Sequence, residues 1–471
     1  MTTSDTTHSA SGVTQAEPTS AQPPGPPPAD TLLRRMRHYA AMVIDPVGAV
    51  EKRFERHGDI YRVQFADNAL YVLRHPDHIR DVLVTHASAW GKGHSQFLRL
   101  NDVLGDSLLT SDGEDWRRQR RLVQPAFAPA RLAEYGDVMV EEAIASADAL
   151  AAAGGAMRDL GKEMTGLTLR IVARTLFGQR ADDGPRITRA MAWLNEAFAS
   201  PDFLPRALPT RGRLRMRRAI ADLDSTVYDL IAQRSAALAD ARGERPRDLL
   251  QRLLDARDDE HTGHGLSPKE VRDQLVTLYL AGHDTTAHAL TWTFYLLSQN
   301  PGAQRELERE LDRELGGRPP CFGDLPELVY TERVIKEAMR IYPPVMALPR
   351  RAVRDTRIGP YAVPAGSEVV IWVYRTHHDP RFFPEPHRFI PERFDDASSA
   401  TRPKHAYLPF GAGQRACIGQ SFAMFEAQLI VATFVQRLQL YYGGARPPGL
   451  RLGVTLAPKG GLPMQVYARP K

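Results

Sequence analysis

The chain has only two cysteines in 471 residues, Cys321 and Cys417. Two cysteines cannot form a disulfide framework, and there is no Cys-x-x-Cys pair that would suggest a zinc site. The sequence also lacks a run of about 18 uninterrupted apolar residues, and its N-terminus lacks the basic segment and apolar core of a signal peptide. These absences predict a cytoplasmic protein without a transmembrane anchor.

The chain also carries little net charge. The 61 basic and 56 acidic residues leave a formal net charge of +5. This mild excess fits either an acidic partner or arginines on a solvated face, and we expect no nucleic-acid partner. The N-terminal part is rich in Ser, Thr and Pro and ends in the proline run of residues 22–28. We expect residues 1–31 to form a disordered tail and residues 32–471 a single domain, large enough to enclose a cofactor.

Helical patterns dominate the sequence, and its few strand patterns lie near the two ends. The strongest helix signal is the segment 267–270, Ser-Pro-Lys-Glu, which combines an N-cap serine, a proline at the first position and a glutamate at the third. No stop signal follows before Asn300-Pro301, so this helix is predicted to span about 30 residues, or roughly 45–50 Å. The expected fold class is mainly α with small β-sheets (α+β), with one long central helix.

The other segments carry weaker signals. A capping-box pattern at residues 111–114 is predicted to open a short basic helix that ends near Pro125. Helical sequence continues to about Leu254, with one proline-rich break at residues 200–213. The remaining predicted elements are strands at residues 60–65, 69–73 and about 368–373, helices at 326–342 and 418–438, and a proline-rich meander at 379–394.

The segment 410–419, Phe-Gly-Ala-Gly-Gln-Arg-Ala-Cys-Ile-Gly, is the most informative part of the sequence. Gly411 and Gly413 allow a tight turn and a close approach of the backbone to a flat ligand. Cys417 stands at the start of a predicted helix, whose free N–H groups are expected to lower the pKa of the thiol. A lone thiolate in such a loop suits one axial bond to iron, whereas an isolated cysteine taken alone is more often a buried structural residue.

Five positions of this loop, Phe410, Gly413, Arg415, Cys417 and Gly419, resemble the cysteine-loop signature Phe-x-x-Gly-x-Arg-x-Cys-x-Gly of the cytochrome P450 family. The resemblance covers roughly residues 32–471 and keeps the motif order of the family, with soluble bacterial members as its nearest type. It implies the cytochrome P450 fold, with the long helix over a haem b (iron protoporphyrin IX) whose iron is bound by the Cys417 thiolate. Phe410, Gly413 and Gly419 are expected to contact this cofactor.

A second motif resembles the part of the family that holds the cysteine loop in place. Glu337 and Arg340 are three residues apart on one helix face. Taken alone, such a pair is usually a solvated surface bridge. Together with Arg393 it resembles the buried Glu-x-x-Arg and Arg triad of the family, which implies a structural role and a large cost if one member is lost.

Arginines at three places resemble the propionate contacts of the family. Trp116 and Arg120 match its Trp-x-x-x-Arg pattern on the short basic helix, and Arg350 and Arg415 match two further positions. Haem propionates are anionic and are bound by arginine or by hydrogen-bonding side chains. The resemblance therefore implies that these four residues bind the cofactor, although any one of the arginines taken alone could face solvent.

The long predicted helix contains Ala-Gly-His-Asp-Thr-Thr at residues 281–286. Glycine weakens a helix interior, and threonine side chains bond back to their own backbone, so one interpretation is a helix that tolerates poor helix formers. The segment resembles the catalytic stretch of the family, which implies a local bulge over the haem. Gly282 would then leave room for dioxygen, and Asp284 and Thr285 would form the acid–alcohol pair that delivers protons. Gly282, Asp284 and Thr285 are the expected catalytic residues.

The resemblance implies a monooxygenase that inserts one oxygen atom from O2 into a hydrophobic small molecule. The residues of the segments expected to line its pocket are mostly Phe, Leu, Val, Met and Ala. Their composition fits a terpenoid, a fatty acyl chain, a steroid or a polyketide-like compound, such as those of secondary metabolism. These segments are residues 87–109, 193–208, 279–285, 345–348 and 454–456.

Two other classes of function remain open at this point. A haem-thiolate peroxygenase, isomerase or dehydratase needs no external electrons, but such relatives tend to lose the acid–alcohol pair that this chain keeps. A non-catalytic haem sensor or carrier has no use for a proton-delivery apparatus. For a monooxygenase, the electrons are expected from a ferredoxin or flavodoxin with its reductase. Arg117, Arg118 and Arg121 lie with Arg120 on the basic helix that docks such an acidic partner in the family, and a merely solvated basic helix is the alternative.

Overall fold

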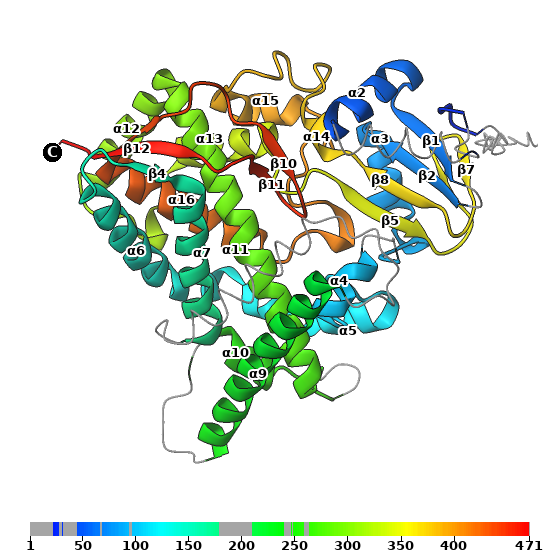
Figure 1. The fold of residues 1–471 in the computed structure, drawn as a ribbon, viewed down its shortest axis with the longest axis horizontal. Coiled ribbons are helices and arrows are strands. Elements are labelled where there is room, and N and C mark those ends of the chain that lie inside the picture. The colour runs from blue at the N-terminus through cyan, green and yellow to red at the C-terminus, as the bar shows by residue number, and fades with distance from the viewer. Residues whose placement is uncertain are drawn as a thin grey trace, which may run out of the picture.

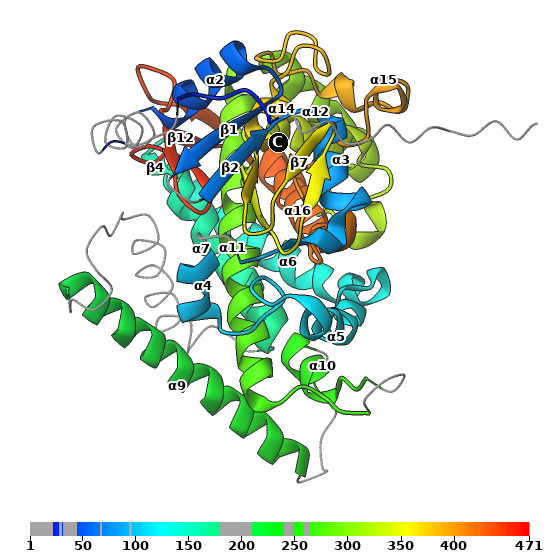
Figure 2. The same ribbon diagram turned by 90° about the vertical axis from the view of Figure 1, so that its right-hand side faces the viewer.

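A long central helix, α11 (Pro268–Gln299), organises the fold of this computed structural model. Figures 1 and 2 show that it crosses the whole molecule. The predicted capping box is present, because Ser267 Oγ accepts from the Glu270 N–H and a Glu270 carboxylate oxygen accepts from the Ser267 N–H. The residues that the structure describes are 22–27, 31, 45–65, 68–93, 97–178, 210–239, 246, 248–258 and 263–470.

The C-terminal half of α11 is buried on every side, as expected for a helix without a polar face. Around it lie α6, α7, α13 and α16, whose apolar side chains form one core cluster with those of α11. The other helices cover this core or the sheets. Their bounds are α2 Pro46–His57, α3 Pro76–Arg80, α4 Phe97–Leu104, α5 Gly113–Val123, α6 Pro129–Ala151, α7 Leu160–Phe177, α9 Arg211–Ala239, α10 Leu249–Asp255, α12 Pro301–Leu315, α13 Val329–Ile341, α14 Val373–His377, α15 Asp396–Thr401 and α16 Gln420–Arg437.

The largest sheet lies beside the helical part (Figure 1) and has the order β1-β2-β8-β5-β3. Strands β2 and β8 are parallel, and the other neighbours are antiparallel. Its strands are β1 Ile60–Phe65, β2 Asn68–Leu73, β3 Trp90–Gly91, β5 Leu348–Ala352 and β8 Glu368–Ile371. The smaller sheets are β4-β12-β9 (Met157–Asp159, Pro463–Ala468, Leu438–Tyr442), β6-β7 (Thr356–Ile358, Tyr361–Val363) and β10-β11 (Leu450–Leu452, Leu456–Pro458).

The mainly α fold with small sheets is confirmed, but some predicted elements differ. Helix α12 was missed, because Pro301 was interpreted only as a stop signal although proline is also favoured at the first position of a new helix. The capping box at residues 111–114 is wrong. Asp112 is the N-cap of α5, and its carboxylate instead accepts hydrogen bonds from the Lys92 N–H and from Arg415. Long-range partners thus compete with the local cap.

Other differences concern the ends of elements. The last helix begins at Gln420 rather than residue 418, and the predicted strand at 368–373 ends at Ile371 because α14 begins at Val373. Of the expected break at 200–213, residues 200–209 lie outside the described residues, and α9 has already begun at Arg211.

Part of the expected N-terminal tail is placed against the sheet. The Arg62 N–H donates to the Pro24 carbonyl at 2.9 Å, and Pro23 is buried. A Cβ on Gly25 would lie 1.9 Å from the Arg62 carbonyl oxygen, so this contact requires glycine. This contact with the domain precedes the predicted boundary at residue 31, and residues 1–21 lie outside the described residues.

Candidate active site

The cysteine loop is a compact turn that leads into α16. The Cys417 N–H donates to the Phe410 carbonyl at 2.9 Å, which closes the loop on itself. Gly411 and Gly413 have φ of 71° and 70°, in the left-handed region that favours glycine. A Cβ on Gly413 would also lie 2.0 Å from the Leu83 carbonyl oxygen, so this turn needs glycine for two reasons. The loop is therefore fixed by its own sequence and by its contact with Leu83 in the helical turn Asp81–Thr85.

The pKa of the Cys417 thiol differs from the sequence-based expectation. Protein packed around the thiol raises its pKa, and this outweighs the Gly419 N–H and the charge of Arg120, which both lower it. The helix that was expected to lower this pKa starts only at Gln420, three residues beyond the cysteine. A bound metal ion is the agent that would lower this pKa. The Cys417 side chain is nonetheless exposed on one side.

Two arginines of the predicted site hold the cysteine loop against α5. An Arg120 nitrogen donates to the Ala416 carbonyl at 2.8 Å, next to the cysteine. Arg415 donates to the Ser111 carbonyl and to the Asp112 carboxylate, and its guanidinium lies 4.0 Å from the centre of the Trp116 ring. Such a cation–π contact orients the guanidinium as well as stabilising it. The structure thus brings together residues separated by about three hundred positions in the sequence.

Two buried cations, Lys92 and Arg350, and the half-buried Arg415 lie together beside the cysteine loop. Burial and the charge of Arg415, opposed by Asp112, together lower the pKa of Arg350 to about 10. Burial also lowers the pKa of Arg415 to about 10. Lys92 is 9% exposed, and burial with the charges of Arg350 and Arg415 lowers its pKa well below the usual value. Cations that repel one another beside the Asp112 carboxylate fit a group that carries anionic carboxylates, as haem propionates do.

Lys92 was missed in the sequence. It directly follows the short strand β3, which pairs with β5, and β5 carries Arg350. A lone lysine after Trp90-Gly91 gives no local signal of a binding role. Its position became informative only when the sheet placed it beside arginines from two distant segments.

The middle of α11 carries the expected catalytic segment. Gly282, Asp284 and Thr285 are half-buried and Ala281 is exposed, although the helix is buried both before and after this turn. The Thr285 hydroxyl donates to the Ala281 carbonyl at 2.7 Å, so the predicted bond from threonine back to its own backbone is present. The predicted bulge does not interrupt the helix, which stays α-helical from Pro268 to Gln299.

Packing relates this segment to the cysteine loop. Helices α11 and α16 are in contact, and Ile418 packs against the apolar cluster that contains Val276 and Tyr279 of α11. A Cβ on Gly282 would meet only a methyl group of Val172, at an ordinary 3.4 Å. Steric contacts with the described protein atoms therefore do not require glycine at position 282.

The Glu337, Arg340 and Arg393 side chains form the expected triad. Arg340 donates to both carboxylate oxygens of Glu337 at 2.7 and 2.8 Å, and Arg393 donates to one of them at 3.1 Å. Arg340 also donates to the carbonyls of residues 377, 386 and 388 in and before the proline-rich meander. Glu337 and Arg340 are 0% exposed, so the interpretation as a solvated surface bridge is excluded.

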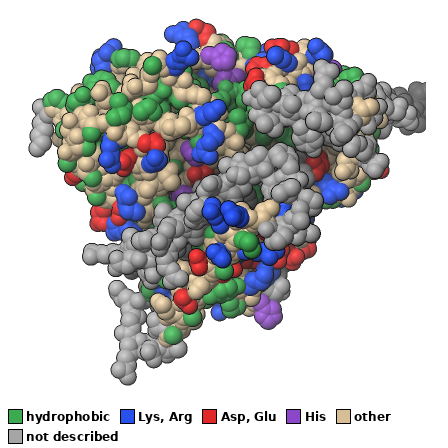
Figure 3. Space-filling view, viewed as in Figure 1, with side chains coloured by type: hydrophobic (Ala, Val, Ile, Leu, Met, Phe, Trp, Pro, Cys, Tyr) green, Lys and Arg blue, Asp and Glu red, His purple; other side chains and the backbone are tan. Residues whose placement is uncertain are grey.

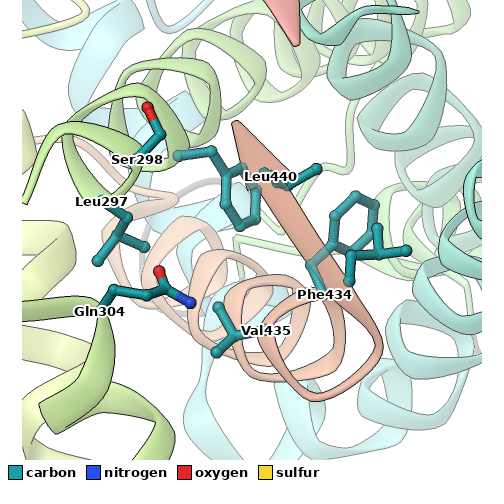
Figure 4. Close-up of a pocket in the computed structure, with 8 residues that line it drawn as sticks. Leu297, Ser298, Gln304, Phe434, Val435 and Leu440 are labelled. Atoms are coloured by element: carbon teal, nitrogen blue, oxygen red, sulfur yellow. The ribbon is translucent and has the colours of Figure 1, made fainter. Parts of the chain in front are cut away.

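A small cavity of about 10 Å³ lies elsewhere, between the ends of α11, α12 and α16 (Figure 4). Its volume suits at most one water molecule. Phe294, the first of its lining residues on α11, is nine residues beyond Thr285, or roughly 13 Å along the helix axis. This cavity is therefore separate from the candidate active site. Of the segments expected to line the substrate pocket, residues 193–208 lie outside the described residues.

Comparison with known proteins gives one consistent result. The family model described as Cytochrome P450 matches residues 24–462. Cyclooctat-9-en-7-ol 5-monooxygenase of Streptomyces melanosporofaciens is 38% identical over 395 residues, which cover 82% of this chain and 83% of the relative. Pentalenene oxygenase of Streptomyces avermitilis is 35% identical over 389 residues, which cover 81% and 84%. The crystal structure of the cytochrome P450DA heme domain matches with a TM-score of 0.85 and 25% identity, over 96% of this chain and 98% of that one.

The fold and the match over nearly the whole chain define the class of protein as haem-thiolate enzymes. The chain belongs to the cytochrome P450 family. It is a cytochrome P450 monooxygenase, an oxidoreductase that acts with molecular oxygen, and the family and fold imply a haem-thiolate cofactor. In the described part of the chain, no helix is both long and apolar enough to span a bilayer.

Proposed function

We propose that this chain binds haem b with Cys417 as the axial ligand of the iron, and that it oxidises a hydrophobic terpenoid with electrons from a separate cytoplasmic redox protein. The observation that carries this proposal is the cluster of Lys92, Arg350 and Arg415 beside the cysteine loop. Haem propionates would supply anionic partners for these cations, which repel one another. Trp116 and Arg120 complete this side of the site, since they hold Arg415 and the cysteine loop.

The two cysteines offer a matched test of the axial ligand. We expect the reduced, carbon-monoxide-bound protein to show the absorption band that gives the family its name. Cys417→Ser should abolish this band, whereas Cys321→Ser, which changes an exposed free cysteine, should leave it unchanged. If Cys417→Ser retained the band, Cys417 would not be the ligand.

When bound, the haem supplies the activation of dioxygen, and the protein supplies a dry pocket and protons. In our proposal Gly282 leaves room for dioxygen, and Asp284 and Thr285 deliver the protons. Asp284 would take up a proton from solvent and pass it, as a carboxylic acid, to the Thr285 hydroxyl, which gives up its own proton on the open side of the α11 turn. The half-buried positions of both side chains on an otherwise buried helix support this assignment.

The substrate class rests on the pocket segments and on the relatives. Among the described residues, Leu348 and Thr455 are half-buried and Val454 is 52% exposed. The relatives are named for cyclooctat-9-en-7-ol and pentalenene, and of the four substrate classes that the sequence allows, the terpenoid class fits these names.

A binding screen tests this choice. Pentalenene, a long-chain fatty acid, a steroid and a macrolide precursor are titrated separately, and the low-spin to high-spin shift of the Soret band is recorded. The expected result is a saturable shift with pentalenene at a lower concentration than with the other three. A preference for the fatty acid or the steroid would contradict the terpenoid assignment.

The proposed electron donor is a ferredoxin or flavodoxin with its reductase, docked on α5. The structure places a carboxylate beside each of three arginines of this helix, with the pairs Arg117–Glu114, Arg118–Glu270 and Arg121–Asp258. Basic and acidic side chains are likewise interspersed on the face shown in Figure 3. The positive field of α5 is therefore smaller than the sequence suggested.

Arg117 is the best residue for testing this docking. Its partner Glu114 is 81% exposed, and an exposed pair of this kind contributes little to stability. We expect Arg117→Glu to slow ferredoxin-dependent turnover at low salt while the haem spectrum stays unchanged, because the charge steers association. Arg309→Glu on α12, in an exposed pair of the same spacing, is the control. Equal rates for both variants would place the docking surface elsewhere.

A further inference from the structure

The Asp284 carboxylate has two side-chain neighbours, and both meet the same oxygen. The Thr455 hydroxyl donates to Oδ2 at 2.5 Å, and Nδ1 of His288 lies 3.6 Å from Oδ2. No hydrogen bond to Oδ1 is formed by the residues that the structure describes. One oxygen is thus bound by the Thr455 hydroxyl, and Oδ1 accepts no hydrogen bond from the described residues.

Thr455 comes from the tight loop between β10 and β11, 171 residues after Asp284. The same small sheet is fixed to α11 two turns further on, where the Trp292 indole N–H donates to the Leu456 carbonyl at 2.9 Å. Asp284, His288 and Trp292 are four residues apart and form one stripe of α11. The loop is therefore attached to this stripe at two points, and the Thr455 hydroxyl is placed by packing rather than by chance.

His288 is buried, and its Nδ1 forms no hydrogen bond with the described residues. A buried polar nitrogen without a partner is costly, and the 3.6 Å between Nδ1 and Oδ2 is longer than a hydrogen bond, so a small shift of the ring would be needed to form one. The charged and titratable groups that act on the ring are Asp284 and His283 of α11 and Arg451 of β10. Burial lowers the pKa of His288; the charge of Asp284 and a hydrogen bond to its backbone raise it, the charges of Arg451 and His283 lower it, and the net lowering favours the neutral ring.

We propose that Thr455 and His288 are positioning residues for Asp284: both hold Oδ2, so that Oδ1 is the oxygen that exchanges a proton with Thr285. In this arrangement His288 is the neutral tautomer that carries its proton on Nδ1, because a carboxylate only accepts hydrogen bonds. The inference rests on the proton-delivery role of Asp284 given above. It adds that the β10–β11 loop, which is distant in the sequence, determines which oxygen of the Asp284 carboxylate exchanges the proton.

The tautomer of His288 gives a test that needs no turnover. In ¹⁵N-histidine-labelled protein in the diamagnetic, reduced carbon-monoxide form, the His288 signals are identified by their loss in His288→Gln. The Nδ1 signal should have the shift of a protonated ring nitrogen at neutral pH. It should move toward that of an unprotonated nitrogen in Asp284→Ala, where no carboxylate accepts the proton. An unprotonated Nδ1 in the unmodified protein would overturn the assignment of His288.

Coupling of electrons to product tests the effect on proton delivery. With pentalenene as probe and an added ferredoxin and reductase, the ratio of hydrogen peroxide formed to NADPH consumed is measured. Thr455→Val removes the hydroxyl at nearly constant shape, and Thr455→Ser restores it. The rate of product formation should fall roughly tenfold in Thr455→Val, with a matching rise in peroxide, and recover in Thr455→Ser. Thr293→Val is the control, because that hydroxyl only bonds the Ala289 carbonyl of its own helix.

Double variants separate positioning from a merely structural role. If Thr455 and His288 act through Asp284, then Thr455→Val and His288→Gln should have no further effect on coupling in an Asp284→Asn background. Additive losses would contradict the inference. Thermal midpoints and the carbon-monoxide spectrum show whether each variant is folded, and Thr455→Val with Thr455→Ser carries the test if His288→Gln does not fold.

Asp284→Asn and Thr455→Val distinguish proton delivery by Asp284 from the positioning of its carboxylate. If Asp284→Asn leaves coupling unchanged, the proposed role of Asp284 is wrong and this inference falls with it. If Asp284→Asn uncouples the enzyme but Thr455→Val behaves like Thr293→Val, only the positioning by the β10–β11 loop is wrong.

Discussion

The buried triad gives the sharpest prediction about stability, through the substitution Glu337→Gln. The Glu337 carboxylate accepts four hydrogen bonds, two from Arg340, one from Arg393 and one from the Ile390 N–H at 3.0 Å. Glutamine keeps the size of the side chain but removes the negative charge. Its NH2 group also replaces one of the two acceptor oxygens by a donor. Both guanidinium groups then remain buried without a counter-charge.

The expected magnitude follows from the burial of the pair. Glu337 and Arg340 are 0% exposed, and breaking a buried ion pair by removing one partner costs about 3–5 kcal/mol. The entropy of unfolding is about 2.1 cal/mol/K per residue, or roughly 0.9 kcal/mol/K for a domain of this size. The midpoint of thermal unfolding should therefore fall by about 3–6 °C. Because Arg340 also binds carbonyls around the meander, the band of the carbon-monoxide complex should be lost at a lower temperature as well.

A matched pair on α12 provides the control. Arg309 and Glu306 have the same three-residue spacing and a 2.6 Å contact, but their side chains are 69% and 47% exposed. Glu306→Gln should change the free energy of unfolding by no more than about 0.5 kcal/mol. Unfolding is followed by circular dichroism at one scan rate for all variants. Equal midpoints for Glu337→Gln and Glu306→Gln would refute the reasoning that burial makes this triad important.

Three further predictions concern the site itself. Thr285→Ala should release hydrogen peroxide instead of product under NADPH-driven turnover, and normal coupling would argue against proton delivery by this hydroxyl. Gly413→Ala should destabilise the protein by at least about 1–3 kcal/mol, because φ is 70° and the Cβ would meet a backbone carbonyl. Gly302→Ala on α12 has open space and should be neutral or stabilising by about 1 kcal/mol in urea unfolding. Lys92→Met removes a buried charge that Arg350 and Arg415 repel, so it should raise the unfolding midpoint of the haem-free protein. The same variant should lose haem to apomyoglobin faster. The reverse pattern would contradict the proposed role of these cations in binding haem.

Much of the fold could be predicted because its signals are local. The capping box and the next stop signal placed α11 to within a residue at each end, and alternating apolar residues placed β1 correctly. The errors arose where a local pattern competed with distant contacts. Asp112 was expected to sit within a local cap, but its carboxylate is used by Arg415, 303 residues away.

The sequence alone determined the chemistry that lies in short motifs. The cysteine loop, the Glu-x-x-Arg pair and the Asp-Thr pair are contiguous, so residue type and spacing were enough to indicate a haem-thiolate enzyme. Even there, the direction of the Cys417 pKa shift was wrong, because the shift depends on how much protein packs around the thiol.

Only the tertiary structure decided how these motifs are held. It placed Lys92 beside Arg350 through the pairing of β3 with β5, and it placed Thr455 on the Asp284 carboxylate. Burial and electrostatic coupling depend on distances between segments that are far apart in the chain, and no local pattern contains those distances. The sequence therefore determined which groups can do the chemistry, and the packing of the chain decided which atoms of those groups face one another.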